Sequence, residues 1–153
     1  MAVQQGEVAP DFELNDQHNQ PVRLSDYRDR KAVAVVFFPL AFSSVCTGEL
    51  CALRDDLGAF QNEDVQVLAV SVDSPFSLAQ FAVQQGYEFP LLSDFWPHGE
   101  AARRYGVFDE ELGVARRATF VLDRDGVVRW TTVNAIPEAR DVQEARQALA
   151  DAA

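Results

Sequence analysis

The sequence has few of the residues that common cofactor and metal sites use, and it has no long apolar run. Of its 153 residues only two are cysteine and two histidine, and Lys31 is the only lysine among 13 basic residues. With so few histidines and cysteines, no set has the spacing of zinc ligands. The longest apolar stretch, residues 32–38 continuing through Pro39 to Phe42, is far shorter than the ~20 residues of a membrane-spanning helix. The sequence therefore excludes a membrane span and disfavours a metal site.

The net charge and the N-terminal residues indicate which binding partners and which cellular compartment to expect. The formal net charge is −11, which repels phosphate backbones and anionic membranes and so disfavours binding to nucleic acid or lipid. The first residues, MAVQQGEVAPDFEL, lack the basic and apolar regions of a secretory signal. We therefore expect a cytoplasmic protein, whose cysteines are catalytic, redox-active or inert rather than a structural disulfide. Neither a phosphate-binding loop nor a dinucleotide fingerprint is present.

The order of apolar patterns predicts one α/β domain spanning residues 1–153. Strand patterns alternate with helical ones, and strand–helix–strand units imply parallel pairing. A late hairpin around residues 124–126 adds an antiparallel edge. A doubly wound sheet is the alternative, but the closing hairpin and helix favour a thioredoxin fold, a mixed central sheet flanked by helices. The expected strands are 11–14, 22–24, 32–38, 65–72, 89–92, 119–123 and 127–133, and the expected helices are 46–60, 75–85, 100–105 and 139–150.

The segment 37–51 runs from a buried strand through a loop into a helix, and it carries the candidate chemistry. Cys46 falls at the helix start, where free backbone N–H groups and the helix dipole would lower the pKa of a thiol below about 8.5. Ser43 lies three residues upstream, within reach of the sulfur or of a bound oxygen. Arg116 and Arg117 precede a predicted strand and could bring a cation to the same edge. Cys46 could equally be a small buried hydrophobe and the arginines solvated charges; spacing does not decide this.

Residues Pro39, Ser43 and Cys46 resemble the peroxiredoxin motif Pro-x3-Thr/Ser-x2-Cys. Three further motifs occur in the order found in that family, so the resemblance covers most of the chain. Segments 37–42, 91–99 and 105–108 are most similar to the actinobacterial alkyl hydroperoxide reductase E group. The further motifs are residues 9–12, 117–121 and the turn 123–126.

The resemblance implies a thioredoxin fold with an added N-terminal hairpin and a thiol peroxidase activity. Cys46 corresponds to the peroxidatic cysteine, which attacks a hydroperoxide and becomes a sulfenic acid. Ser43 corresponds to the hydroxyl that contacts the peroxide, and Pro39 to the proline that shields the sulfur. Arg117 corresponds to the site arginine and Glu49 to the glutamate that orients it. No metal, haem, flavin or nicotinamide is needed.

A second cysteine, Cys51, departs from the single-cysteine pattern of the alkyl hydroperoxide reductase E group. Its spacing from Cys46 resembles the PrxQ (bacterioferritin comigratory protein) group, in which the cysteine five residues on resolves the sulfenic acid. On an intact helix the two Cα atoms would lie ~8.6 Å apart, beyond the ~7 Å limit of a disulfide. Resolution would therefore require unwinding, which Gly48 would ease. The alternative is an inert Cys51 and an external resolving thiol.

The expected partners are hydrogen peroxide or an organic hydroperoxide and a reductant such as thioredoxin or a mycoredoxin. Phe42, Phe95 and Trp96 fall in predicted loops at the site edge, where exposed aromatics indicate an interface. Related peroxiredoxins dimerise through these loops, so we expect a homodimer. A peroxide-sensing redox protein is an alternative. A disulfide reductase fits poorly, because the C-x2-C position is occupied by Glu49.

Overall fold

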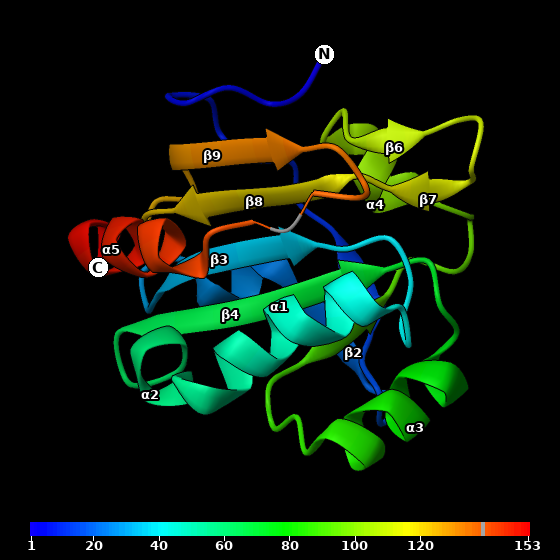
Figure 1. Ribbon diagram of the computed structural model, residues 1–153. Coiled ribbons are helices and arrows are strands. Elements are labelled where there is room, and N and C mark those ends of the chain that lie inside the picture. Colours follow the sequence, from blue (N-terminus) through cyan, green and yellow to red (C-terminus); the bar gives the residue numbers. More distant parts are fainter. Residues whose placement is uncertain (139) are drawn as a thin grey trace.

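A mixed sheet of seven strands, with helices on both faces, forms the centre of the protein (Figure 1). The computed structural model describes residues 1–138 and 140–153, with the backbone alone for residues 45–47. The sheet has the order β2-β1-β5-β4-β3-β8-β9. Its strands are β1 (Glu13–Asn15), β2 (Pro21–Arg23), β3 (Ala32–Phe37), β4 (Val65–Ser71), β5 (Leu91–Ser93), β8 (Arg117–Leu122) and β9 (Val128–Asn134).

The pairing confirms the predicted thioredoxin-like topology. Strands β3, β4 and β5 are parallel, and β8 and β9 extend the sheet antiparallel on the far side of β3. The N-terminal hairpin β1–β2 lies at the opposite edge, where Asn15 pairs antiparallel with Ser93 of β5. The parallel strands all end at one edge, which is where sites form in such sheets.

The two faces of the sheet have separate apolar cores because successive strand residues point to opposite sides. Every residue of β3 and β4 is buried. Phe38 faces the core beneath helices α1 (Ser44–Asp55), α2 (Leu57–Phe60), α3 (Pro75–Gln85) and α5 (Val142–Ala152). Phe37 faces the core that includes α4 (Glu100–Arg104) and Leu24, the first residue of the 3-10 helix η1 (Leu24–Tyr27). Both phenylalanines are core residues, as the sequence predicts for such a strand.

Helix boundaries agree with the sequence where capping residues are clear and differ where they are not. Helix α3 has the expected bounds, 75–85, and Ser74 caps it by accepting a hydrogen bond from the Ser77 amide. The single helix expected over residues 46–60 is wrong, because Asp56 has φ −126° and ψ 35°, which separates α1 from α2. The last helix begins at Val142 rather than at residue 139, with the Asp141 side chain as its cap.

A short second sheet, β6 (Phe108–Asp109) paired with β7 (Val114–Ala115), was not predicted. Two-residue strands are too short to show an alternating pattern. The turn between them is held by Asp109, whose Oδ1 accepts hydrogen bonds from the amides of Glu111 and Leu112. None of the described helices has the length and apolarity that a membrane crossing requires.

Candidate active site

The loop between β3 and α1 is fixed by a hydrogen bond to the loop that follows the neighbouring parallel strand, β4. The amide of Ala41 donates to Oδ2 of Asp73 at 2.8 Å, and the Ser71 hydroxyl donates to the same oxygen at 2.6 Å. Asp73 lies two residues after the end of β4, so this carboxylate ties together the loops that leave two adjacent strands. Pro39 is buried in this loop.

Phe42 lies at the outer end of the same loop in an uncommon backbone conformation. Its φ is 69°, in the left-handed region that bulky side chains rarely adopt. The ring packs against Phe81 of α3, with 5.0 Å between the centroids, and is still half exposed. The loop is therefore held by packing as well as by Asp73, and Ser43 follows as a half-buried residue.

Helix α1 begins at Ser44, two residues earlier than expected, so Cys46 is its third residue and lies in its first turn. Its side chain lies outside the part of the chain that the structure describes. The first turn of α1 faces the carboxyl edge of the parallel strands, where its N–H groups have no partners within the helix. Such a position stabilises a thiolate.

One turn further along α1, Glu49 lies in a buried group of charges that we call the Glu49 cluster: Glu49, Arg117 and Arg140. Oε2 of Glu49 lies 2.9 Å from Nε of Arg140 and 3.4 Å from a terminal nitrogen of Arg117. Oε1 accepts the backbone amide of Arg140 at 2.9 Å. The three residues are 5, 2 and 7% exposed. The cluster holds two positive charges and one negative charge away from water, so removing Glu49 would leave two buried cations without their counter-ion.

Arg117 and Arg116 separate at the start of β8. Arg117 is buried, and its Nε donates to the carbonyl of Ile136. Arg116, which directly precedes the strand, is exposed. The alternative that the sequence left open is thereby resolved in favour of Arg117 as the arginine next to Glu49.

Arg140 is the functional candidate that the sequence analysis missed. Its guanidinium donates to the carbonyl of Ala118 and the hydroxyl of Thr119, both at 3.0 Å, and also to the carbonyl of Phe37. It thus joins the end of β3, the start of β8 and α1. Glu49, expected to orient Arg117, makes its shorter bonds to Arg140. Nothing in the sequence distinguishes Arg140 from other arginines, because it lies 91 residues from Glu49.

Cys51 lies away from the Glu49 cluster, on the side of α1 that contacts the end of α3. Its Sγ is 3.3 Å from the Tyr87 hydroxyl and 3.7 Å from Oε1 of Gln85. One turn further along, Arg54 donates to the carbonyl of Gln85 at 2.7 Å. The thiol is partly exposed and held in a defined place.

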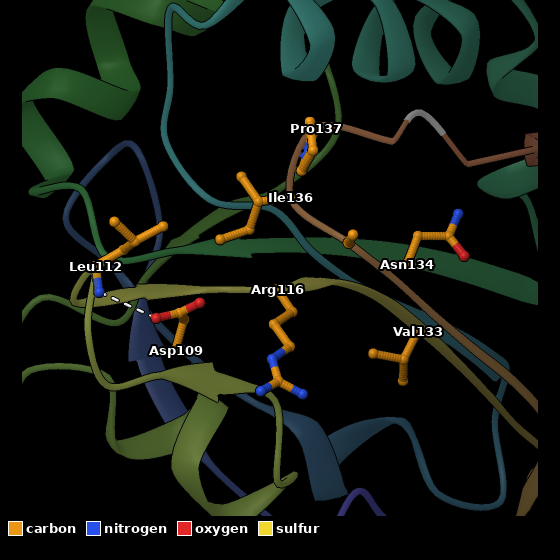
Figure 2. Close-up of a pocket in the computed structure, with 8 residues that line it drawn as sticks. Asp109, Leu112, Arg116, Val133, Asn134, Ile136 and Pro137 are labelled. Carbon is orange, nitrogen blue, oxygen red and sulfur yellow. Dashed lines mark hydrogen bonds between the residues drawn. The ribbon is translucent and has the colours of Figure 1, made fainter.

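An open pocket lies beside the cluster (Figure 2). Its volume is about 460 Å³, and its wall includes Ile136, whose carbonyl holds Arg117. We call it the Arg116 pocket; it is lined by Asp109, Leu112, Arg116, Val133, Asn134, Ala135, Ile136 and Pro137. Among the described residues, no three histidine, cysteine or carboxylate side chains are grouped as metal ligands.

Comparisons with known proteins identify the family to which the chain belongs. The chain is 50% identical to the alkyl hydroperoxide reductase E of Mycobacterium tuberculosis over 145 residues, covering 95% of each chain. It is similar to the crystal structure of peroxidoxin BcpB from Mycobacterium tuberculosis, with a TM-score of 0.85, 32% identity and 96% coverage of both chains. It is also similar to AhpC from Enterococcus faecalis, with a TM-score of 0.88, 28% identity and coverage of 99% and 92%. Residues 5–131 match the AhpC/TSA family model. On its sequence and on its fold, the chain belongs to the AhpC/TSA family and is a peroxiredoxin.

Proposed function

We propose that this peroxiredoxin reduces hydroperoxides with Cys46 as the attacking thiolate and Cys51 as the resolving thiol. The observation that carries the first part is that the Pro39–Ser43–Cys46 motif leads into the first turn of α1, and that Glu49, in the next turn, binds Arg117 and Arg140. The relatives named alkyl hydroperoxide reductase E support a hydroperoxide substrate.

In the oxidation step, the Cys46 thiolate attacks one peroxide oxygen as the O–O bond breaks. Sulfur gains an S–O bond and becomes a sulfenic acid, and the leaving alkoxide takes a proton to become an alcohol or water. Negative charge develops on the leaving oxygen. The Arg117 guanidinium, the Ser43 hydroxyl and the first N–H groups of α1 are the donors that would stabilise this charge. Pro39 would keep water from the sulfur.

Glu49 and Arg140 act through Arg117 rather than on the peroxide. Arg117 is constrained by its bond to Ile136, by its pairing with Glu49 and by its place in β8. Arg140 binds the other oxygen of Glu49 and the strand carbonyls. The cluster would therefore hold the guanidinium in place before the peroxide arrives, so little reorganisation is needed during the reaction.

In the resolution step, the Cys51 thiol attacks the Cys46 sulfenic acid, an S–S bond forms and water leaves. Helix α1 is continuous across both cysteines, so five helical residues separate the two Cα atoms by ~8.6 Å. A disulfide therefore requires local unwinding. Gly48 is exposed with open space around it, whereas Glu49 is anchored in the buried cluster. We infer that unwinding covers residues 44–48 and stops at Glu49.

The resolving role can be tested by adding one equivalent of hydrogen peroxide to the reduced protein, trapping free thiols and measuring the mass. We expect the loss of two hydrogens and a peptide that links Cys46 to Cys51. Cys51→Ser is the matched control, because its hydroxyl can still bond to Tyr87 and Gln85; this variant should retain the sulfenic acid. A stable sulfenic acid in the wild type, with Cys51 still open to alkylation, would favour an external resolving thiol instead.

An external dithiol must then reduce the disulfide, and a reductant of the thioredoxin or mycoredoxin type in a reducing, cytoplasmic compartment is our expectation. A peroxide sensor would share the oxidation step. Steady-state assays distinguish the two, since a peroxidase consumes many equivalents of hydroperoxide with such a reductant and a sensor does not.

We also propose a homodimer through the edge at which the parallel strands end. Phe42, Phe76, Phe95 and Trp96 are between 50 and 81% exposed there. Phe95 and Trp96 line one surface hollow together with Pro75, the residue before Phe76. Exposed aromatic groups in one place are typical of interfaces. Light scattering should give the mass of two chains for the wild type and of one chain for a Phe76→Ser/Trp96→Ser variant. Val83→Ser, also highly exposed on α3, is the control that should remain dimeric.

A further inference from the structure

The Arg116 pocket combines an apolar wall with a cation that the fold does not use. Leu112, Val133, Ile136 and Pro137 supply apolar surface, and Leu112 remains 64% exposed. Arg116 lines the same pocket, and its guanidinium makes no hydrogen bond or ion pair with any residue that the structure describes. In the described chain, every other arginine except Arg28 donates from its side chain to a carboxylate or a carbonyl.

This pattern fits a ligand with an apolar body and an anionic end. The protein has a net charge of −11, so most of its surface repels anions and an unpaired guanidinium is a local exception. The volume of about 460 Å³ is within the range of ligand pockets, and it far exceeds the ~30 Å³ that a water-sized molecule occupies. Hydrogen peroxide alone would need no such space.

The position of the pocket connects it to the reaction. Ile136 contributes to its wall, and the carbonyl of Ile136 accepts the hydrogen bond from Arg117. Figure 2 shows the Arg116 side chain extending away from Ile136, between Asp109 on one side and Val133 on the other. The end of the pocket near Ile136 is thus the end near the proposed active site, and the free guanidinium lies at the other end.

We propose that Arg116 determines substrate specificity by binding the carboxylate of hydroperoxides that carry an apolar chain, such as oxidised fatty acids. The inference rests on the proposed function, since the chain would lie along Leu112, Val133 and Ile136 with its peroxide group toward Arg117. Arg116 would act in binding and take no part in breaking the O–O bond.

The negative charge of Asp109 would weaken the binding of a carboxylate in this pocket, so removing that charge should have a predictable effect. Its carboxylate also lines the pocket, but Oδ1 is occupied by the amides of Glu111 and Leu112. Asp109→Asn keeps that acceptor and removes the negative charge. This variant should therefore react faster with a carboxylate-bearing hydroperoxide than the wild type does.

The test compares linoleic acid hydroperoxide with its methyl ester, which differ only in the anionic group. Rate constants for Cys46 oxidation are measured by stopped-flow tryptophan fluorescence and normalised to hydrogen peroxide for each variant. We expect the wild type to favour the acid about 5-fold, the size of one partly exposed ion pair. In Arg116→Gln the ratio of acid to ester should fall to about 1, and in the wild type it should fall as salt is added.

Arg28→Gln is the matched control, because it removes the other arginine whose side chain makes no hydrogen bond or ion pair with a described residue; it should keep the wild-type ratio. A ratio near 1 in the wild type, or a ratio that Arg116→Gln leaves unchanged, would overturn the inference while rapid oxidation by hydrogen peroxide upholds the proposed function. The inference would also be overturned if Arg116→Gln changed only the rate at which a carboxylate-bearing thiol reduces the oxidised protein. Arg116 would then bind the reductant and not the hydroperoxide. Slow oxidation of Cys46 by every hydroperoxide would overturn the proposed function as well.

Discussion

Arg116 and Arg117 are consecutive in the sequence, yet their surroundings are opposite. Arg117 is 2% exposed and bound by Glu49 and Ile136, while Arg116 is exposed and lines an open pocket. Arg117 is the first residue of β8 and is buried, whereas Arg116 lies just before the strand and is exposed. Arg117 is therefore a cation that the fold holds rigidly, and Arg116, the residue before it, is a cation that can bind a ligand. The comparison teaches that the chemistry of a residue type is decided by the face on which it lies.

Removing a cation from the buried side should have the largest effect on stability. Arg140→Met leaves Glu49 with a single, longer ion pair and deprives Ala118 and Phe37 of their donor. We expect the free energy of unfolding in urea to fall by about 3–5 kcal/mol. Arg146→Met is the control, since its ion pair with Asp56 is about half exposed and should contribute less than ~1 kcal/mol. Equal losses in the two variants would show that burial of the Glu49 cluster has no special energetic weight.

Arg117→Lys should have the next largest effect, on rate rather than on stability. Lysine keeps the charge but loses the planar fork that can bond to Ile136, Glu49 and a peroxide together. We expect Cys46 oxidation to slow by about 10²- to 10³-fold, by a similar factor for hydrogen peroxide and for organic hydroperoxides. Stopped-flow fluorescence measures the rates, and urea titration measures the folded fraction. A rate that falls only as far as the folded fraction falls would contradict a role for Arg117 in the reaction.

The smallest effect is expected on the exposed side. Arg116→Gln should change the free energy of unfolding by no more than about 0.5 kcal/mol, because no described contact is lost. Urea titration of this variant and of Arg140→Met would compare the losses in the free energy of unfolding on the exposed and on the buried side. A loss above ~1 kcal/mol would mean that Arg116 has a structural task, and the division between the two arginines would no longer hold.

The fold could be predicted from the sequence because its strongest signals are local. The apolar run of β3, the capping Ser74 and the turn before β9 each depend on neighbouring residues, and each is observed. The break at Asp56 was missed because the apolar spacing continues through it in Leu57 and Phe60. The β6–β7 pair was missed because it is too short to have a period.

The residues of the candidate site that belong to one linear motif could be predicted from the sequence. The residues that are brought together only by contacts in the fold could not. Pro39, Ser43 and Cys46 have a fixed spacing in one segment. Arg140 has no such spacing, since its partners come from α1, β3 and β8. The Arg116 pocket is formed by residues between Asp109 and Arg116 and by the end of β9 with the segment after it, which meet only in the folded chain.

The bond between Ala41 and Asp73 has a practical consequence for following the enzyme through its cycle. An amide in a surface loop usually exchanges its hydrogen with solvent quickly, but this one is held by a carboxylate at 2.8 Å and should exchange slowly. Deuterium uptake at Ala41 therefore provides an internal gauge of how far structural loosening spreads from residues 44–48 toward β3 after oxidation. Unchanged uptake would confine the loosening to the helix, and faster uptake would extend it into the loop.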